Sequence, residues 1–371
     1  AVSLSALAAA VNAAAAQPSF ATYAKNYGSA LTNPGALKGE KVMVMPGDSQ
    51  LAACEEIAQA FSVLAKAEGQ SPTIFQNDGE TSQYITAFED AIHEGYKSIS
   101  IECDFNPASV APVIAQAEKA GVKVIVYGAT QQENIQAHVQ GSTVDPYALD
   151  AQVAAEQAVL QSGGKPFQAI AITSNQAPAT AIMQDALMKE LSKICPACTV
   201  TDYDVEVPEW TADVGSTVTS ALIKNPKVSV IFPDYAGMLS DVLAGIEAAH
   251  RTTSVRTYLA FGGGTPFIQL QAAPPGSKII QSDIGGYPVW TGYLLYYQTA
   301  RVLTGMTPIP YALAYGPDRV ATPQNAAQIL TTGGWGTDFV NGFRSLLGLS
   351  TLSGHALFEA ATLNGTMTAK V

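Results

Sequence analysis

Charged side chains are scarce in this sequence, and positively charged ones are the scarcest. Only 13% of the 371 residues are charged, and 19 Lys and Arg stand against 31 Asp and Glu, which gives a net charge of −12. An acidic chain without a basic stripe repels the phosphates of DNA and RNA, so we expect no nucleic-acid partner. Long hydrophobic runs are also missing, because no uninterrupted apolar stretch reaches the ~18–20 residues of a membrane-spanning helix. With 47% hydrophobic residues, the chain can still bury a large core and fold as a soluble globular protein.

Cysteine and histidine are rare, with four of each. Cys195 and Cys198 form a single CxxC pair between a predicted helix and a predicted strand. A zinc site would need two further ligands at a suitable spacing, and the histidines do not supply them. A redox-active CxxC normally opens a helix, whereas this pair follows one. We therefore predict a local disulfide between Cys195 and Cys198 and no metal site, and we leave the pairing of Cys54 with Cys103 open. An even number of cysteines fits an oxidising, extracytoplasmic compartment.

Motifs for catalysis and cofactor binding are missing as well. The glycine run 262–264 follows a predicted strand but lacks the GxGxxG spacing of a dinucleotide site, and Pro266 comes shortly after it. The chain has no GxSxG nucleophile motif. Glu102 and Asp104 flank Cys103 at a strand end, where a ligand-contacting or capping role is favoured over general acid catalysis. We therefore expect no cofactor, and an α/β enzyme is the least favoured function.

The N-terminal segment is rich in alanine but lacks basic residues. The first Lys or Arg is Lys25, whereas a secretion signal begins with a basic segment. We therefore interpret 1–16 as a helix of a mature chain from which any signal peptide has been removed. Asn33, Pro34 and Gly35 interrupt any helix and indicate a linker over 33–39.

From Lys41 onward, a short apolar run, a polar loop and an amphipathic segment alternate. The predicted strands lie at 41–45, 73–75, 98–101, 122–126 and 135–139, then at 169–172, 200–205, 228–232 and 257–261, with an extra strand at 278–281. The predicted helices include one that ends at Lys66 and others at 84–94, 108–120, 145–161, 179–193, 211–224, 237–249 and 289–303. Continuous Val and Ile runs indicate strands buried on both faces, as in parallel sheets. Two consecutive sets of alternating strands and helices predict two doubly wound α/β domains.

The loops that follow the predicted strands are the candidate ligand-binding site, because ligands of open α/β sheets bind just outside the carboxyl ends of the strands. Polar and aromatic side chains alternate in these loops. They suit a neutral, hydroxylated small molecule, whose edges accept and donate hydrogen bonds while its C–H surfaces stack on aromatic rings. The candidates are Ser49, Gln50, Asp104, Phe105, Tyr127 and Ser142 from the first set, with Asn175, Trp210, Asp234, Tyr235 and Asp283 from the second set and the extra strand.

The order and spacing of these segments resemble those of type I periplasmic binding proteins of the ribose-binding-like class, which bind sugars. The resemblance covers roughly 41–303. Residues 41–67 resemble the family's first strand and helix, and 137–150 resemble its first crossover between lobes. Residues 229–245 resemble a strand with a polar ligand loop, and 276–305 resemble the return to the first lobe.

The resemblance also assigns roles to single residues. Trp210 falls where family members place a stacking aromatic residue, Asp234 or Tyr235 where an amide reads sugar hydroxyls, and Asp283 after the last strand of the first lobe. An Asp-Arg pair common in the family is replaced by Gly128 and Ala129, which removes charge-assisted contacts to sugar hydroxyls. This departure points to a sugar-like ligand that is less hydroxylated or more aromatic than a simple pentose or hexose.

The resemblance implies two doubly wound parallel-sheet lobes joined by a three-segment hinge that closes on a ligand. It divides the chain into an N-terminal helix and linker (1–38), a first lobe (39–142 with 266–307), a second lobe (143–265 with 308–330) and a C-terminal extension (331–371). It further implies a monomeric, extracytoplasmic solute-binding component of an ABC importer, free or lipid-anchored, with a membrane permease as its partner and no catalytic activity. The alternative is a ligand-sensing domain that presents its bound state to a receptor.

Overall fold

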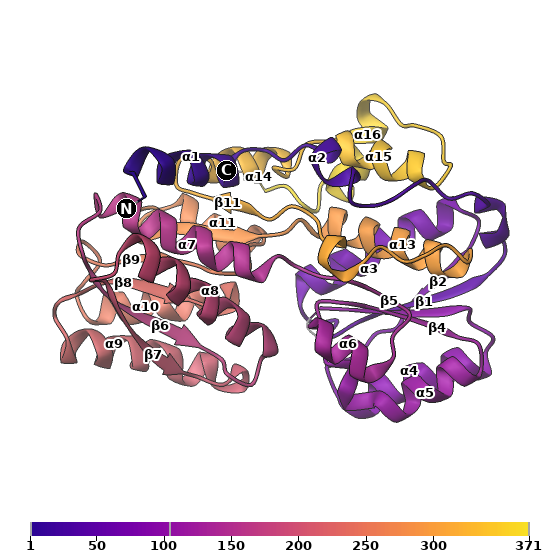
Figure 1. The fold of residues 1–371 in the computed structure, drawn as a ribbon, viewed down its shortest axis with the longest axis horizontal. Coiled ribbons are helices and arrows are strands. Elements are labelled where there is room, and N and C mark those ends of the chain that lie inside the picture. Colours follow the sequence, from indigo (N-terminus) through magenta and orange to yellow (C-terminus); the bar gives the residue numbers. More distant parts are fainter. Residues whose placement is uncertain (1, 104, 370–371) are drawn as a thin grey trace.

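The computed structural model describes residues 2–103 and 105–369, which form two α/β lobes lying side by side (Figure 1). Each lobe is a sheet with helices on both faces, as continuous apolar strands require when neither face meets water. The predicted fold class, with two lobes built on parallel sheets, is confirmed.

The first lobe contains a parallel sheet in the order β2-β1-β3-β4-β5. Its strands are β1 (Lys41–Pro46), β2 (Ser71–Ile74), β3 (Ser98–Glu102), β4 (Lys123–Tyr127) and β5 (Gly141–Thr143). Its helices are α3 (Ala52–Ala67), α4 (Thr81–His93), α5 (Ala111–Lys119), α6 (Gln131–Ala137) and, from much later in the chain, α13 (Pro288–Leu303). Helix α13 packs directly on α3 at Gly292, where a Cβ atom would lie 2.4 Å from the carbonyl oxygen of Ile57.

The second lobe contains a six-stranded sheet in the order β11-β10-β9-β8-β6-β7, in which only β11 is antiparallel. Its strands are β6 (Gln168–Thr173), β7 (Thr199–Asp204), β8 (Val228–Pro233), β9 (Arg256–Tyr258), β10 (Ile280–Gly285) and β11 (Arg319–Ala321). Its helices are α7 (Tyr147–Gln161), α8 (Pro178–Ile194), α9 (Gly215–Lys224), α10 (Leu239–Ala248), α11 (Thr265–Ala272) and α12 (Gly276–Ile279).

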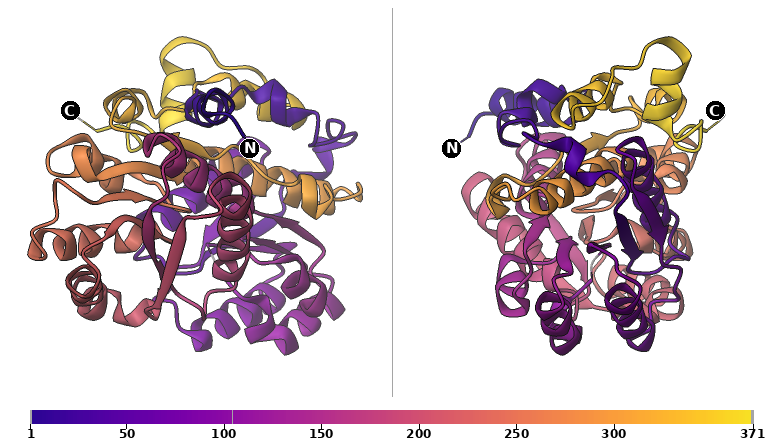
Figure 2. Two further views of the ribbon diagram at one scale, coloured as in Figure 1. Left: turned by 60° about the vertical axis from the view of Figure 1, so that its left-hand side comes forward. Right: turned by 90° about the vertical axis from the view of Figure 1, so that its right-hand side faces the viewer.

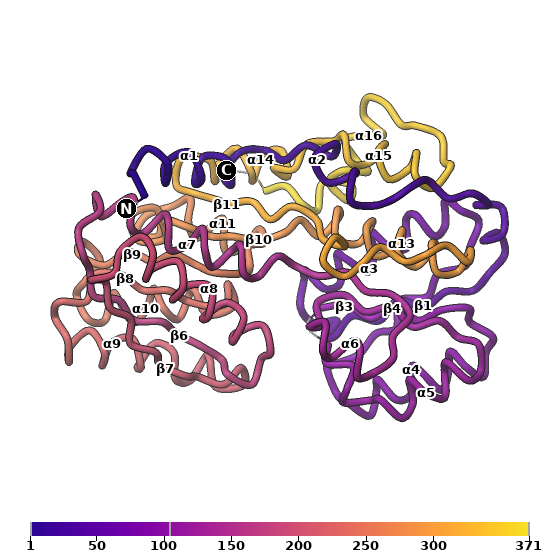
Figure 3. The backbone as a smooth tube through the Cα atoms, viewed as in Figure 1, coloured from indigo at the N-terminus to yellow at the C-terminus, as the bar shows by residue number. Residues whose placement is uncertain are grey.

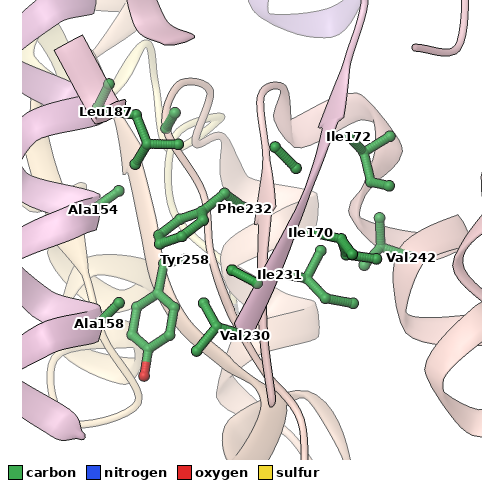
Figure 4. Packing of buried hydrophobic residues seen from close by; sticks show 14 of the residues in the cluster. Ala154, Ala158, Ile170, Ile172, Leu187, Val230, Ile231, Phe232, Val242 and Tyr258 are labelled. Carbon is green, nitrogen blue, oxygen red and sulfur yellow. The ribbon is translucent and has the colours of Figure 1, made fainter. Parts of the chain in front are cut away.

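The core of the second lobe shows why its central strands β6 and β8 are largely apolar. Phe232 of β8 points toward Ala154 and Tyr258 of β9 toward Ala158, both of α7, whereas Ile231 of β8 points toward Val242 of α10 (Figure 4). Successive side chains of β8 therefore enter two different buried layers, which favours apolar residues on both faces of this strand.

Two predicted elements are wrong in type or in position. Residues 135–139, predicted as a strand, contain the end of helix α6, which a capping box between Thr130 and Glu133 starts. The extra strand β10 was expected to return to the first lobe with 266–307. It instead pairs with β9 and β11 of the second lobe, and only α13 returns to the first lobe. Hydropathy reveals a strand but not its pairing partner, which explains the second error.

Segments outside the two lobes cover one side of the molecule, where both the first and the last helices lie (Figure 2). These are α1 (Leu4–Ala15), α2 (Phe20–Ala24), α14 (Ala326–Thr332), α15 (Asp338–Leu346) and α16 (Gly354–Thr362). Helix α1 packs on α7 and β11 of the second lobe, whereas α2 packs on α15, which covers α13 of the first lobe. We call the connecting residues 16–19 the strap, because they join a helix on one lobe to a helix on the other.

The chain passes between the lobes three times within 143–318, and Figure 3 traces these passages. They lie between β5 and α7, between β10 and α13, and between α13 and β11. Tyr27, which follows α2, links the start of α13 to the third passage: its hydroxyl donates to the carbonyl oxygen of Tyr315 (2.9 Å) and accepts from Nε1 of Trp290 (3.1 Å). Among the described residues, no helix is long and apolar enough to span a membrane.

Candidate functional site

The loops at the carboxyl ends of the strands lie on the sides of the two lobes that meet at the hinge. Tyr147, at the start of α7, donates a hydrogen bond from its hydroxyl to the carbonyl oxygen of Gly128 after β4 (3.0 Å). Tyr127, at the end of β4, donates from its hydroxyl to the Asp145 carboxylate. These contacts join the strand ends of the first lobe to the start of the second.

We call these loops together the inter-lobe face. On the first lobe it comprises 46–50, 77–80, 102–103, 105–106 and 127–130. On the second lobe it comprises 173–176, 204–210, 233–236 and 261–264.

On the first lobe, two loops of the inter-lobe face are hydrogen-bonded to each other. The amide of Ser49 donates to the carbonyl oxygen of Asn77, and the amide of Asn77 donates back to the Ser49 hydroxyl, both at 3.0 Å. Gln50 is exposed, and its side-chain amide donates to Asp78 (3.2 Å). Of the predicted residues here, Ser49 is engaged with the neighbouring loop. The side-chain amide of Gln50 and the carboxylate of Asp78 are open to solvent.

A disulfide between Cys54 and Cys103 links the start of α3 to the end of β3. The pairing left open from the sequence is therefore present. Gly47 lies against this junction: its amide donates to the Glu102 carbonyl oxygen (2.7 Å), and a Cβ atom would lie 2.5 Å from the Cys103 carbonyl oxygen. Only glycine allows β1 and β3 to approach this closely at the inter-lobe face.

Two predicted aromatic residues of the first lobe are buried. Phe105 is 4% exposed and packs edge-on against Tyr84 of α4, with ring centres 4.8 Å apart. The Tyr84 hydroxyl donates to the Gly47 carbonyl oxygen (2.5 Å). Tyr127 is 8% exposed and is engaged with Asp145. In this conformation Phe105 and Tyr127 therefore shape the loops and offer little surface to a ligand.

On the second lobe, four aromatic rings form a continuous row. Trp210 stacks on Tyr235 (5.7 Å, 27°), Tyr235 meets Phe261 edge-on (6.4 Å), and Phe261 meets Tyr147 edge-on (4.9 Å). We call these four residues the aromatic row. It runs from the loop after β7 to the hinge, where Tyr147 contacts Gly128 of the first lobe.

Polar contacts hold the outer end of the aromatic row in place. Nε1 of Trp210, which lies in a π-helical turn (Trp210–Val214), donates to the Ser174 hydroxyl (2.9 Å) and to the Val205 carbonyl oxygen (3.2 Å). The hydroxyls of Tyr235 and Thr180 are hydrogen-bonded (3.0 Å). Trp210 is half-buried, and its N–H group has two acceptors within the protein. The indole therefore has a structural role in this loop in addition to the ligand contact expected from the sequence.

Asn175 and Asp234 differ sharply in exposure. Asn175 is exposed at the start of the β6–α8 loop, and its backbone amide donates to Asp204 Oδ1 (2.7 Å). Asp234 is fully buried and accepts a hydrogen bond from the Gln184 side chain (2.7 Å). Burial raises the pKa of Asp234 to about 8, so its side chain is mainly protonated at neutral pH. A neutral carboxyl here both donates and accepts hydrogen bonds.

Two predicted site residues lie within strands and not in the loops that follow them. Asp283 lies within β10 of the second lobe, paired with Ala321, and its burial raises its pKa to about 7. Ser142 lies within β5, and it lines a surface cavity of about 410 Å³ between α6 and 308–311 that is separate from the inter-lobe face. Asp104 lies outside the described residues.

The glycine run 262–264 has a packing role. Gly262 forms a parallel bridge with Gly285, the last residue of β10, and a Cβ atom on Gly285 would lie 1.6 Å from the Gly262 carbonyl oxygen. Gly262 also has φ +151°, and a Cβ atom there would lie 2.1 Å from Cβ of Ala236. Both positions need glycine because backbone packs on backbone.

Sequence reasoning missed several residues of this region. Asn77 and Asp78 follow a predicted strand, so the rule that found the other loops would also have found them. The sequence gives little indication that Tyr147 and Phe261 belong to this region, because their ring contact joins residues far apart in the chain.

The predicted disulfide, Cys195–Cys198, is present at the turn between α8 and β7, at the amino end of β7 and so away from the inter-lobe face. Among the described residues, one group of three potential metal ligands lies close together, namely Cys54, Glu102 and Cys103. The two sulfur atoms are bonded to each other, so this group offers no thiolate to a metal.

Two α/β lobes with facing strand ends and a hinge of three segments define the type I periplasmic binding protein fold. Residues 42–307 match the model of the periplasmic binding protein domain, and the chain belongs to the periplasmic binding protein family. No curated protein sequence matches the chain.

Solved structures share the fold at low sequence identity. An ABC transporter solute-binding protein from Agrobacterium vitis with bound allitol is 19% identical, with a TM-score of 0.66, over 79% of this chain and 98% of that one. A 5-methylthioribose transporter solute-binding protein from Thermotoga lettingae is 14% identical, with a TM-score of 0.65, over 91% and 99% of the two chains. A solute-binding protein from Burkholderia graminis in complex with D-arabinose is 18% identical, with a TM-score of 0.61, over 78% and 97%.

Proposed function

We propose that this protein is the extracytoplasmic solute-binding component of an ABC importer. It captures a small sugar or sugar-like molecule between the lobes, closes by bending at the hinge and delivers the ligand to a membrane permease. The observation that carries the proposal is the inter-lobe face, where polar loops of the first lobe and the aromatic row of the second meet at the hinge. Family membership supports the same function. The protein acts as a monomer and does no chemistry on its ligand.

The composition of the inter-lobe face supports a ligand that combines polar edges with an apolar surface. Gln50, Asp78 and Asn175 provide exposed amides and a carboxylate, and Trp210 and Phe261 are only partly buried. Amides and carboxylates hydrogen-bond hydroxyl groups, while indole and phenyl rings cover C–H faces. Relatives of the same fold have been solved with allitol, 5-methylthioribose and D-arabinose, which combine these two features.

The test is a binding screen on the full chain with pentoses, hexoses, hexitols, 5-methylthioribose, nucleosides and aromatic acids. We expect one chemical class to bind at a 1:1 ratio in calorimetry. It should stabilise the protein by about 2.7 kcal/mol at a concentration of 100 Kd. The ligand should be recovered unchanged, and small-angle scattering should show a smaller radius of gyration in its presence. Turnover of a panel member, or 1:1 binding without compaction, would contradict capture by closure.

A further inference from the structure

Two segments run between the lobes in addition to the three hinge passages. The strap (16–19) joins α1, which packs on α7 and β11 of the second lobe, to α2, which packs on α15 over the first lobe. Residues 333–337, which we call the return segment, join α14, which packs on α11 of the second lobe, to α15, which packs on α13 of the first lobe. The hinge is therefore accompanied by two further connections.

Arg319 fastens both connections to β11, the strand that follows the third hinge passage. It is 6% exposed, and its Nε donates to the carbonyl oxygen of Ala15, just before the strap (2.8 Å). Its Nη1 donates to the carbonyl oxygen of Gly334 in the return segment (2.5 Å), and its Nη2 to Gln328 Oε1 of α14 (3.3 Å). No carboxylate of the described residues forms an ion pair with it. Because a buried guanidinium is costly unless its N–H groups are hydrogen-bonded, Arg319 and these oxygen atoms hold each other in place.

Both ends of the strap are held, one on each lobe. At the second-lobe end, the carbonyl oxygen of Ala15 accepts a further hydrogen bond from Asn325 Nδ2 (3.3 Å). At the first-lobe end, the amide of Phe20 donates to Asp338 Oδ2 of α15 (3.1 Å), and the Phe20 ring lies 5.8 Å from that of Trp290 in α13, centre to centre. These contacts transmit a movement of either lobe to the strap.

The strap is already extended between these two ends. The backbone torsion angles of Ala16 and Ser19 lie in the β region. Pro18 fixes its own φ and disfavours the helical region at Gln17. Even a fully extended chain spans at most about 18 Å over the steps between the two held ends. The strap therefore has little spare length when the lobes move.

The strap and the inter-lobe face lie on opposite sides of the hinge. In Figure 1 the strap crosses above the hinge, whereas α6 and α8, which begin just after loops of the inter-lobe face, lie below it. A cavity of about 490 Å³ lies between the strap and the hinge, lined by Pro18 of the strap and by Pro146 and Tyr315 of the hinge passages. Bending that brings the strand ends together therefore moves the two ends of the strap apart.

We infer that the strap opposes closure of the lobes and that Arg319 sets how strongly it does so. In the present conformation Gln50 and Asn175 of the inter-lobe face are exposed, so the lobes have not yet closed over them. Closure stretches the strap until the hydrogen bond between Arg319 and Ala15 breaks or α1 shifts on α7. A contact that stabilises only the open form lowers the apparent affinity for a ligand of the closed form. This inference rests on the proposed function and adds to it a restraint that tunes affinity from outside the site.

The first test lengthens the strap. Gly-Ser-Gly-Ser is inserted between Gln17 and Pro18, which adds slack and leaves both held ends in place. The control carries the same insertion between Ser350 and Thr351, two exposed residues in the loop that joins α15 to α16. That loop does not run between the lobes, so any general effect of an insertion appears in both variants.

The distance between the lobes is measured without ligand. Spin labels are attached to Gln132→Cys of α6 and Ala181→Cys of α8, two exposed positions, and double electron–electron resonance gives the distribution of distances. The labels react only there, because the four native cysteines are paired. We expect the lengthened strap to raise the population at short distances about threefold, and the control insertion to leave the wild-type distribution unchanged.

A second pair of variants separates the restraint from a merely structural role of Arg319. Arg301 is also buried, and its guanidinium donates to the carbonyl oxygens of Ser29 and Thr307 (both 2.9 Å), which belong to neither the strap nor the return segment. We expect Arg319→Gln and Arg301→Gln both to lower the free energy of unfolding in urea, and only Arg319→Gln to raise the population at short distances. If either variant fails to fold, the strap insertion still decides the question.

Binding gives an independent measurement with allitol, 5-methylthioribose and D-arabinose as probes. Any of them that binds should bind about threefold more tightly to the lengthened strap than to the control insertion, in calorimetry. Equal distance distributions in these two variants, or a shift to longer distances with the lengthened strap, overturn the inference and leave the proposed function in place. A probe that binds without shortening the distance in the wild type overturns capture by closure, and the inference with it.

Discussion

The two lobes prepare their halves of the inter-lobe face by different means. On the first lobe, a disulfide and a pair of reciprocal hydrogen bonds hold the loops, while the side chains of Gln50 and Asp78 remain exposed. On the second lobe, the side chains themselves are held, since Tyr235 is buried between Trp210 and Phe261. The first lobe therefore has a fixed backbone with adaptable side chains, whereas the second presents a rigid aromatic surface.

This difference suggests how recognition is divided. A rigid surface loses little conformational entropy when a ligand docks, whereas exposed amides and carboxylates lose rotamer freedom when they form their hydrogen bonds. We expect the second lobe to fix the position of the ligand and the first lobe to complete its hydrogen bonds on closure. Variants that disrupt either the disulfide of the first lobe or the aromatic row of the second test this comparison.

The largest effect on stability should come from removal of the Cys54–Cys103 disulfide of the first lobe. Cys54–Cys103 spans 49 residues of sequence, whereas Cys195–Cys198 spans only three. If disulfides act mainly by restricting the unfolded chain, the long link stabilises by about 4 kcal/mol and the short one by about 2 kcal/mol. We predict that Cys54→Ser with Cys103→Ser lowers the free energy of unfolding about twice as much as Cys195→Ser with Cys198→Ser, as measured by urea denaturation.

The same two double variants also serve as each other's control for binding. Only Cys54–Cys103 anchors loops of the inter-lobe face, so its loss should weaken ligand binding, while loss of Cys195–Cys198 should leave Kd unchanged. Equal effects on Kd would show that the first lobe does not depend on its disulfide to position the site.

The next effect should come from the aromatic row. Trp210→Ala removes the ring that stacks on Tyr235 and the donor to Ser174 and Val205, so we predict a loss of about 1–3 kcal/mol in binding free energy. Trp210→Phe keeps a ring but loses the N–H donor, and its Kd should lie between those of the wild type and the alanine variant. A wild-type Kd for Trp210→Ala, measured by calorimetry, would exclude the aromatic row from recognition.

Sequence patterns located strands and many loops well, because a run such as 228–232 is apolar on both faces and only a buried strand requires that. They failed where the deciding contact is distant in sequence. The pairing of β10 with β9 and the stacking of Trp210 on Tyr235 both join segments that no local pattern connects. They also failed at α6, where the capping box at Thr130 and Glu133 decides the structure of a segment that also shows a short apolar alternation.

The smallest and most specific prediction concerns Asp234 and Asp283, two of the buried acidic side chains of the second lobe. The carboxyl group of a solvated aspartate has a pKa of about 3.9. Burial raises the pKa of Asp234 to about 8 and that of Asp283 to about 7. Between about pH 4 and these values, the folded protein holds protons that the unfolded chain has released. The unfolded state then binds fewer protons, so the free energy of unfolding falls as pH rises through the window and levels off above it.

Asp234→Asn should therefore flatten the decline in stability from about pH 4 to about pH 8, and Asp283→Asn should flatten it only up to about pH 7. Urea denaturation of both variants without ligand, at pH 5, 6, 7 and 8, measures these slopes against the wild type. The two variants should differ from each other mainly between pH 7 and 8. A wild-type slope in both variants would mean that these carboxyls are ionised in the folded protein. The second lobe would then hold buried charges at these two positions.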